Sequence, residues 1–479
     1  MSHCKRLIAV SSLLLTSACI NMAPEHERPA LSVPASYSAS DRPEGTAVAS
    51  EIDWQDYFRD ERLRVLIRTA LENNRDLMVA TAKIEQARAQ FRIQDSNRFP
   101  SIEATGSGTR TRTPLDTIAV GQGNGTSGGP DAITYNRYNV GVGVTAFELD
   151  FWGRLANLSE AARAQYLSTV AAQRSFYLSL IGDVASTYYQ LIESQEQLEL
   201  AQATAKSRSE GLSIAKKRLD AGVTSALEYR QAEGLLTTAQ QQVAAEELAS
   251  AQLQNQLQVL VGGKFPENLP PGGQLSDQAP TIYLDAGLPS DLMLVRPDII
   301  AAEETLRAAR ANIGAARAAF FPNISLTGSA GFASSELDGL FKGGAFTWSA
   351  GPSINLPIFD WGGREANLDV AKAQETEAVA TYDKTVQTAF REVSDALAGR
   401  RWLARQVLAL EDNVKAQENI AHISTLRYRE GVDDYLEVLD AERSLFSARQ
   451  SLLTTRRALY QNAATLFIAL GGGAPNADN

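Results

Sequence analysis

The chain has 479 residues and a formal net charge of −11, and only two of its residues, Cys4 and Cys19, are cysteines. This acidic balance argues against a nucleic-acid partner, because nucleic acid selects basic patches. The three histidines, His3, His26 and His422, offer neither a metal cluster nor a catalytic triad. We therefore expect a protein that is not an enzyme and that needs no metal or cofactor.

A lipoprotein signal peptide is predicted for residues 1–18. The basic pair Lys5 and Arg6 precedes an apolar stretch, and Thr-Ser-Ala then leads into Cys19 like a lipoprotein cleavage box. About a dozen apolar residues are too few to span a bilayer, which favours a secretory leader. We expect a covalent lipid on Cys19; the alternative is an ordinary signal peptide with an incidental cysteine. Ile20, where inner-membrane lipoproteins carry Asp, favours the outer membrane.

The rest of the chain repeats one unit, with Gly222-Val-Thr-Ser returning as Gly431-Val-Asp-Asp. Such internal similarity indicates a duplicated architecture. Each copy predicts a helix, two strands and a long helical hairpin. The expected order is an extended proline-rich tether over 19–50, a first repeat over 51–265, a linker over 266–287, a second repeat over 288–471, and a tail over 472–479.

The long hairpins are predicted from the absence of proline between Pro130 and Pro266 and between Pro357 and Pro475. Interior proline costs a helix about 3 kcal/mol, so these intervals permit very long helices. Apolar residues recur at alternating spacings of three and four, the period of helices that coil around neighbours. We expect the hairpins over 154–261 and 363–470.

Four segments alternate apolar with small or polar residues: 101–113, 135–149, 323–336 and 348–359. Such segments, with aromatic residues at their ends, are typical of membrane β-strands. A soluble sheet with one buried face is the alternative. Four strands cannot close a barrel, and lipid does not tolerate open sheet edges. Copies of the chain must therefore share a barrel, either a dimer of eight strands or a trimer of twelve.

Several motifs along the chain resemble the outer-membrane efflux proteins, specifically the OprM/NodT-type lipoprotein relatives of TolC. They are Trp54-Gln-Asp-Tyr-Phe-Arg-Asp60, Arg296-Pro-Asp-Ile299, Ala311-Asn-Ile-Gly-Ala-Ala-Arg-Ala-Ala-Phe-Phe-Pro322, Leu356-Pro-Ile-Phe-Asp360 and Gly431-Val-Asp-Asp-Tyr-Leu436. The resemblance implies a mixed fold: a transmembrane β-barrel with four strands per chain, twelve in a homotrimer, continued by a long α-helical coiled-coil barrel. It also implies a lipid-anchored outer-membrane exit channel for small molecules, with a periplasmic adaptor and an inner-membrane RND-type transporter as partners.

Two connections between strands are expected at the cell exterior. The segment from Pro114 to Ile133 is rich in glycine, and the one from Phe341 to Phe346 is shorter. A phosphate-binding glycine loop needs a following helix N-terminus and usually a lysine. Neither is present, so we interpret the first segment as a mobile loop and not as a nucleotide site.

The helical hairpins turn at Gly222 and Gly431, where glycine supplies a left-handed C-cap. Each glycine precedes a predicted capping box, which begins at Ser225 in one copy and at Asp434 in the other. These turns lie at the far ends of the long helices and are expected to form the periplasmic tip.

Carboxylates crowd the second turn only, and symmetry would multiply inward-facing acids into a ring around a bore. The resemblance implies that Asp433, Leu436 and Asp440 form the inner constriction of a periplasmic gate. It also implies that Arg427 and Tyr428 hold neighbouring helices closed. A solvated helix end is the alternative for the acids.

Two other functions remain open for this sequence. One is an exit duct for type I protein secretion, and the other is a periplasmic coiled-coil protein without a pore. The four alternating segments argue against the second, whereas the cleavage box and the Gly431 turn favour drug efflux over protein secretion. The substrate itself is not encoded in any motif of the chain.

Overall fold

A computed structural model describes residues 21–30, 33–37, 47–114, 132–279, 282–285, 287, 289 and 292–473. Cys19 with its signal peptide, the glycine-rich segment 115–131 and the end of the tail lie outside the described residues. The chain forms two compact units, which cut across the two repeats. The first comprises Met1–Arg28, Gln86–Tyr166 and Glu304–Val379, and the second comprises Pro29–Glu85, Leu167–Glu303 and Ala380–Asn479.

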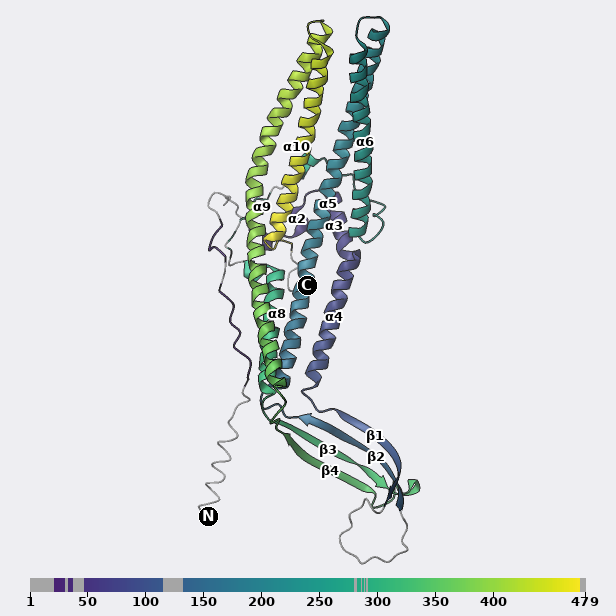
Figure 1. The fold of residues 1–479 in the computed structure, drawn as a ribbon, viewed down its shortest axis with the longest axis vertical. Helices are drawn as coiled ribbons and strands as arrows, with labels where there is room; N and C mark the ends of the chain where they lie inside the picture. The colour runs from purple at the N-terminus through teal and green to yellow at the C-terminus, as the bar shows by residue number, and fades with distance from the viewer. Residues whose placement is uncertain are drawn as a thin grey trace, which may run out of the picture. The chain divides into compact units, whose positions relative to one another are not determined.

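Corresponding helices of the two long hairpins have the same length. The outward helices α5 (Arg154–Asp220) and α9 (Gly363–Arg429) each contain 67 residues, and the return helices α6 (Ala226–Leu260) and α10 (Tyr435–Ala469) each contain 35 (Figure 1). The duplication seen in the sequence therefore extends to the length of every limb. In the described part of the chain, no helix combines the length and the apolar character needed to cross a membrane.

Shorter helices precede each half of the sheet. They are α2 (Trp54–Tyr57), α3 (Glu61–Asn73), α4 (Arg75–Ser96), α7 (Leu292–Val295) and α8 (Pro297–Ala318), with short 3₁₀ turns at Ala49–Glu51, Leu275–Gln278 and Leu337–Gly339. Asp60 ends the segment after α2 and accepts hydrogen bonds from the backbone of Arg62 and Leu63, which caps α3. Asn74 separates α3 from α4, because its side chain caps the new helix at Leu77 and also donates to the carbonyl of Leu260.

The four strands form one antiparallel sheet in the order β1-β2-β3-β4 (Figure 1). They are β1 (Ile102–Pro114), β2 (Ala132–Glu148), β3 (Asn323–Ser334) and β4 (Phe346–Asn355). The expected fourth strand, 348–359, is wrong at both ends: it begins two residues earlier and stops at Asn355. Pairing with β3 ends at Asn323, and Pro357 has no N–H with which to continue a ladder.

The sheet has one apolar and one polar face, because residues directly opposed on antiparallel strands share a face. Val140 pairs with Phe332, which pairs with Phe346, and these side chains share the apolar face. Asn139 on β2, and Ser329 and Ser349 on β3 and β4, belong to the opposite, polar face. That polar face bounds a hollow of about 440 Å³.

A β-bulge adjusts the alternation near the end of β2. The register shifts between Val144 and Phe147, and Ala146 takes a positive φ of 51°. The extra residue changes which face the following side chains occupy. Phe147 therefore pairs with Leu326 on the apolar face, although its odd number would otherwise place it on the polar one.

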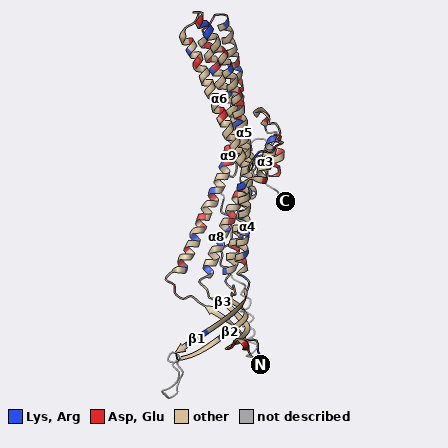
Figure 2. Ribbon diagram, turned by 90° about the vertical axis from the view of Figure 1, so that its right-hand side faces the viewer, with Lys and Arg blue, Asp and Glu red and all other residues tan. Residues whose placement is uncertain are grey.

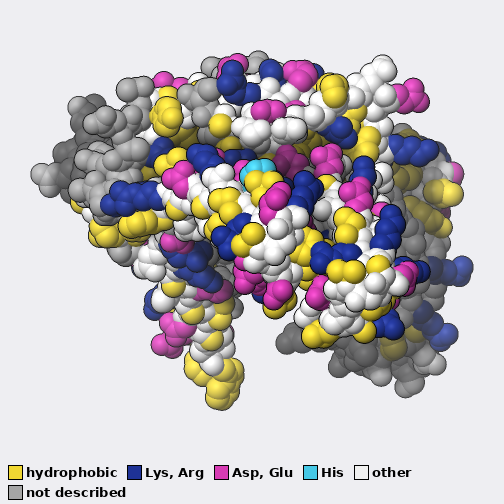
Figure 3. All heavy atoms as spheres, turned by 90° about the horizontal axis from the view of Figure 1, so that it is seen from above, with side chains coloured by type: hydrophobic (Ala, Val, Ile, Leu, Met, Phe, Trp, Pro, Cys, Tyr) yellow, Lys and Arg dark blue, Asp and Glu magenta, His cyan; other side chains and the backbone are white. Residues whose placement is uncertain are grey.

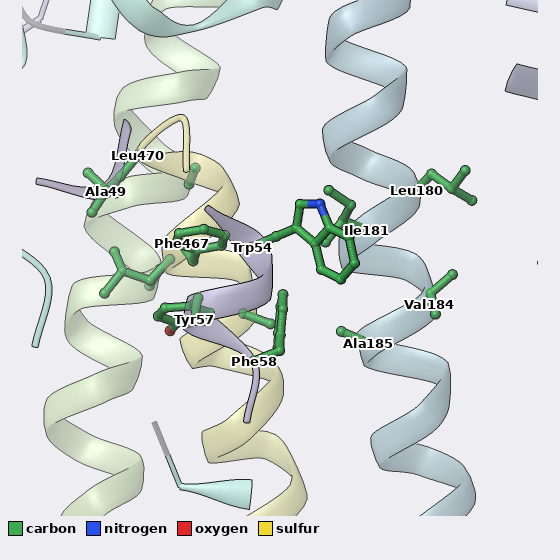
Figure 4. Close-up of a cluster of buried hydrophobic side chains, with 14 of the residues drawn as sticks. Ala49, Trp54, Tyr57, Phe58, Leu180, Ile181, Val184, Ala185, Phe467 and Leu470 are labelled. Carbon is green, nitrogen blue, oxygen red and sulfur yellow. The ribbon is translucent and has the colours of Figure 1, made fainter. Parts of the chain in front are cut away.

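The core of the second unit forms around α2. Trp54, Tyr57 and Phe58 lie between α5 and α10, where the rings of Tyr57 and Phe467 stack with centroids 4.1 Å apart (Figure 4). Phe467 is fully buried, and the Tyr57 hydroxyl donates to the carbonyl of Ala463 at 2.8 Å. Burial raises the pKa of Tyr57, so this hydroxyl remains a donor.

Arg296 fixes the start of α8 against the second hairpin. This buried guanidinium contacts the carboxylate of Asp298 at 2.6 Å, that of Glu392 at 2.8 Å and the carbonyl of Ala469 at 3.1 Å. The Arg-Pro-Asp segment noted in the sequence is thus a structural anchor, because one charge satisfies groups from α8, α9 and the end of α10.

We expect the stability of the sheet to depend on Gly331, where β3 pairs with Gly141 of β2. A Cβ at Gly331 would lie 2.4 Å from the carbonyl oxygen of Val140 and 2.5 Å from Cα of Gly141. Gly331→Ala should therefore destabilise the folded protein by about 1–3 kcal/mol through overpacking, measured as a fall in its thermal unfolding temperature. Gly351→Ala is the matched control on β4, where a Cβ would meet no atom within 4 Å. Equal melting of the two variants would contradict the packing argument.

Candidate functional site

The candidate site consists of the turns that join α5 to α6 and α9 to α10. Gly222 and Gly431 both adopt left-handed backbone, with φ of 72° and 74°. After each glycine, a valine N–H donates to the carbonyl of the residue five positions earlier: Val223 to Arg218 and Val432 to Arg427, both at 2.9 Å. The two turns are thus the same Schellman motif, as their shared sequence predicts.

The N-caps differ between the copies. Ser225 accepts a hydrogen bond from the backbone of Glu228 at 3.4 Å, whereas the Glu228 carboxylate bonds Thr224 and does not complete the box. Asp434 has cap backbone angles, but its side chain makes no cap hydrogen bond. The expected second capping box is therefore wrong. The Glu437 N–H donates to the backbone carbonyl of Asp434 at 3.2 Å, which leaves the exposed Asp434 carboxylate out of the cap.

Arg427 binds within its own turn. Its Nε and Nη2 both donate to the Asp433 carboxylate, with a distance of 2.9 Å for Nη2 to Oδ1. This bidentate contact lowers the pKa of Asp433 and raises that of Arg427. Asp433 occupies both of these donors, and the expectation that Arg427 holds a neighbouring helix stays a prediction.

Tyr428 does connect the two hairpins. Its hydroxyl accepts a hydrogen bond from Arg218 Nη1 of α5, and the guanidinium carbon of Arg218 lies 5.0 Å from the centroid of the Tyr428 ring. The ring also packs against Tyr435 of α10, with centroids 5.0 Å apart. Arg218 was not identified as a site residue from the sequence. The repeat contained the signal, because Arg218 occupies the position that corresponds to Arg427.

A second cross-hairpin contact lies around Arg208 of α5. Arg208 is only 6 % exposed. Its Nη1 donates to the carbonyl of Leu235 at 3.0 Å, and its guanidinium carbon lies 5.7 Å from the centroid of the Phe446 ring. Burial lowers the pKa of Arg208 and raises the pKa of Glu442, while the two charges attract each other. Burial also raises the pKa of Tyr435 to about 12. No local sequence motif predicts these contacts.

The remaining predicted residues of the tip, Leu436 and Asp440, are exposed in the single chain. Leu436 is 56 % exposed, and the exposed Asp440 bonds Arg443 of its own helix. Asp433 and Asp440 therefore each have an arginine partner, which reduces the net negative charge expected of an acidic ring. Acidic and basic residues occur together near the ends of the hairpins (Figure 2), and side chains of both charges lie on the face seen from that end (Figure 3).

A groove of about 530 Å³ lies between α5, α9 and α10 below the tip. His422, Phe446 and Arg449 are among the residues that line it. In the described part of the chain, no cluster of three or more His, Cys, Asp or Glu residues could hold a metal ion. The contacts described at the tip are ones that hold helices together.

Comparison with known proteins gives concordant matches. The family model described as outer membrane efflux protein matches residues 66–263 and 288–472. The solvent efflux pump outer membrane protein SrpC of Pseudomonas putida is 44 % identical over 475 residues, covering 96 % of this chain and 97 % of its own. The cation efflux system protein CusC of Escherichia coli O157:H7 is 39 % identical over 479 residues, with 99 % of each chain covered.

Solved structures agree with this similarity. A membrane protein from Pseudomonas aeruginosa superposes with a TM-score of 0.86 at 38 % identity, covering 95 % of this chain and 98 % of its own. The open state of the MtrE outer membrane channel of Neisseria gonorrhoeae gives 0.84 at 38 % identity, covering 96 % of this chain and 100 % of its own.

We predict that Arg218→Gln loosens the contact between the hairpins. Loss of the hydrogen bond to Tyr428 should cost about 1 kcal/mol, or roughly fivefold in amide hydrogen-exchange protection over 427–435. Arg230→Gln is the matched control, because the contacts of Arg230 with Glu233 and with the Tyr229 ring both lie within its own helix. Unchanged protection in Arg218→Gln would show that this contact does not hold the tip.

Asp433 and Glu442 should contribute to stability in opposite pH ranges. The pKa of Asp433 is lowered, so its pairing contributes stability above the ordinary aspartate pKa of about 3.9 and loses it only below that value. The pKa of Glu442 is raised, so its contribution is complete at low pH and is lost as pH rises through the raised value. Lowering pH from about 7 to 5 should increase exchange protection around Glu442 and leave that of the Asp433 turn unchanged.

Glu442→Gln provides the control for this pH experiment. The variant should abolish the gain around position 442 while the Asp433 turn behaves as in the wild type. A gain that persists in Glu442→Gln would assign the pH response to another group.

Proposed function

Because the chain belongs to the outer membrane efflux protein family, we propose that this outer-membrane efflux channel is the exit duct of a tripartite pump, through which small molecules pass passively. One observation carries the proposal. A four-stranded sheet with an apolar and a polar face is connected to two helical hairpins of equal length. Such a chain supplies a share of a membrane wall and a share of a helical tunnel.

We propose a homotrimer. The strands at both ends of the sheet order, β1 and β4, each lack a partner on one side among the described strands. Joining β4 of one copy to β1 of the next satisfies these backbone groups without an edge in lipid. Both a dimer of eight strands and a trimer of twelve meet this requirement, and the resemblance to TolC-type channels favours the trimer. The polar face then lines the bore, and the apolar face contacts lipid.

The partners follow from the exposed tips. Val223 and Leu227 in the first turn, and Val432 in the second, are 63–67 % exposed although they are large and apolar. Apolar groups presented at the same positions of both turns suit docking to another protein. We propose a periplasmic adaptor at this end, which connects the channel to an inner-membrane RND-type transporter. A lipid on Cys19 would add an anchor in the outer membrane.

Efflux of small molecules is favoured over type I protein secretion by the relatives. The similar proteins are named for solvent, toluene, antibiotic or cation efflux. In such an assembly the transporter selects the cargo, and a water-filled bore conducts it. We therefore propose no substrate class narrower than small toxic molecules for the channel itself.

The tip is the proposed gate. The Arg218–Tyr428 contact holds the two hairpins of a chain together, and the Arg427–Asp433 pair stiffens the turn that carries Leu436. In a trimer, Leu436, Asp433 and Asp440 of three copies would surround the narrowest point. Opening then requires the hairpins to separate at Tyr428.

We predict that Asp433→Ala with Asp440→Ala increases single-channel conductance in planar bilayers, on the order of twofold, and lowers the preference for cations. The physical reasons are the loss of two acids per chain and release of the turn from Arg427. Thr224→Ala is the control, because Thr224 occupies the matching position in the first turn. Unaltered currents in the double variant would contradict the gate, and the absence of any conductance in the wild type would contradict the channel.

A further inference from the structure

Two arginines lie on the face of the sheet that is otherwise apolar or uncharged. The four described strands contain five charged residues, of which Glu103, Arg137 and Glu148 belong to the polar face. Arg110 pairs with Asn136, and Arg112 pairs with Thr134, in the same alternating series as Val140 and Val142. These two arginines are therefore the only charges on the apolar face of the described strands.

Their position along β1 corresponds to the edge of a bilayer. Arg110 lies eight residues after Ile102, a distance of about 27 Å along the strand and roughly 20 Å across a membrane at a tilt of about 40°. The apolar band of an outer-membrane barrel is about 25 Å tall. Because α4 leads directly into the Ile102 end of β1, the arginines lie at the end remote from the helices.

Aromatic side chains occupy the same face next to the arginines. Tyr138 pairs with Gly108, one step before Arg110 in the alternation, and its ring would lie 3.1 Å from a Cβ at Gly108. Phe346 of β4 also belongs to this face, in register with Phe332, Val140 and Gly106, and is 59 % exposed. Aromatic belts mark the level of lipid headgroups, so Arg110 and Arg112 come at or just beyond that level.

Both guanidinium groups are available for a ligand. The residues are exposed, and neither has an ion-pair partner in the part of the chain that the structure describes. Arg137 on the polar face differs, because its Nε donates to Asn139 at 3.2 Å. An arginine on a lipid-facing surface is tolerated only near the interface. A planar guanidinium there matches a phosphate group with two parallel hydrogen bonds.

We propose that Arg110 and Arg112 bind the phosphate groups of outer-leaflet lipid headgroups, the chemistry that a phosphorylated glycolipid presents. This inference rests on the proposed function, because it requires the strands to cross the outer membrane with the helices on the periplasmic side. Asn136 and Thr134 stand opposite the two arginines and add polar side chains to the same strip. Attraction between these residues and the phosphate groups fixes the depth of the barrel in the membrane.

The test compares two variants of the full-length lipoprotein in phosphatidylcholine nanodiscs that contain a small fraction of diphosphorylated lipid A. Bound lipid A is counted by native mass spectrometry after the nanodisc is removed. Arg110→Gln with Arg112→Gln should weaken lipid A binding by about 30-fold, roughly fivefold for each arginine. Arg137→Gln is the matched control, because Arg137 lies on the same strand pair but faces the bore. Its binding should equal that of the wild type.

A second set of nanodiscs contains lipid A from which both phosphates have been removed. The wild type should bind this lipid no better than the double variant binds the phosphorylated form. Equal binding of both lipids, unchanged binding in the double variant, or equal loss in Arg137→Gln would each overturn the inference.

Conductance of the same preparations in planar bilayers separates this inference from the proposed function. A double variant that conducts normally but has lost lipid A supports the lipid site. A wild type that conducts normally while the double variant retains lipid A overturns the lipid site alone. A wild type that neither inserts nor conducts overturns the function itself.

Discussion

β1 and β4 each hydrogen-bond to a neighbour on one side only, and the interior of a membrane has no water to satisfy the other side. Every other part of the molecule is compatible with this constraint. The apolar face of Val140 and Phe332 suits lipid, and the polar face of Asn139 and Ser329 suits an aqueous bore. The described strands thus form a wall segment with two open edges, which is the reason for proposing association with copies of the chain.

The duplication supplies the second organising principle. The two hairpins have identical limb lengths and identical Schellman turns, so the backbone of the tip is nearly symmetric within one chain. The side chains break that symmetry. Arg427 folds back onto Asp433 in its own turn, whereas the corresponding Arg218 reaches across to Tyr428. Equivalent residues of the repeat therefore make different contacts: Arg427 stiffens its own turn, and Arg218 joins the two hairpins.

Features that depend on local chemistry could be predicted from the sequence, and features that depend on contacts between helices could not. Alternation in two-residue steps identified the strands, and Gly222 and Gly431 identified the turns, because glycine favours left-handed backbone at a helix end. The Arg208 and Tyr428 contacts join residues far apart in the chain, and only the relative rotation of two helices brings them together. The cap at Asp434 is an exception among the local features, because the Glu437 N–H donates to the backbone carbonyl of Asp434 and not to its carboxylate.

The bulge at Ala146 also determines how the sheet is connected to the helix that follows. Successive side chains of a strand point to opposite faces of the sheet. One extra residue therefore moves every later side chain of β2 to the other face. With the bulge, Phe147 faces the apolar side, and Glu148 can accept from Arg154 at the start of α5 and from Asn323 at the start of β3. The bulge therefore acts as a phase shift between the two periodicities of the chain. Side chains alternate every two residues along β2 but recur every 3.6 residues along α5. The bulge places Glu148, the last residue of the strand, beside Arg154, the first residue of the helix.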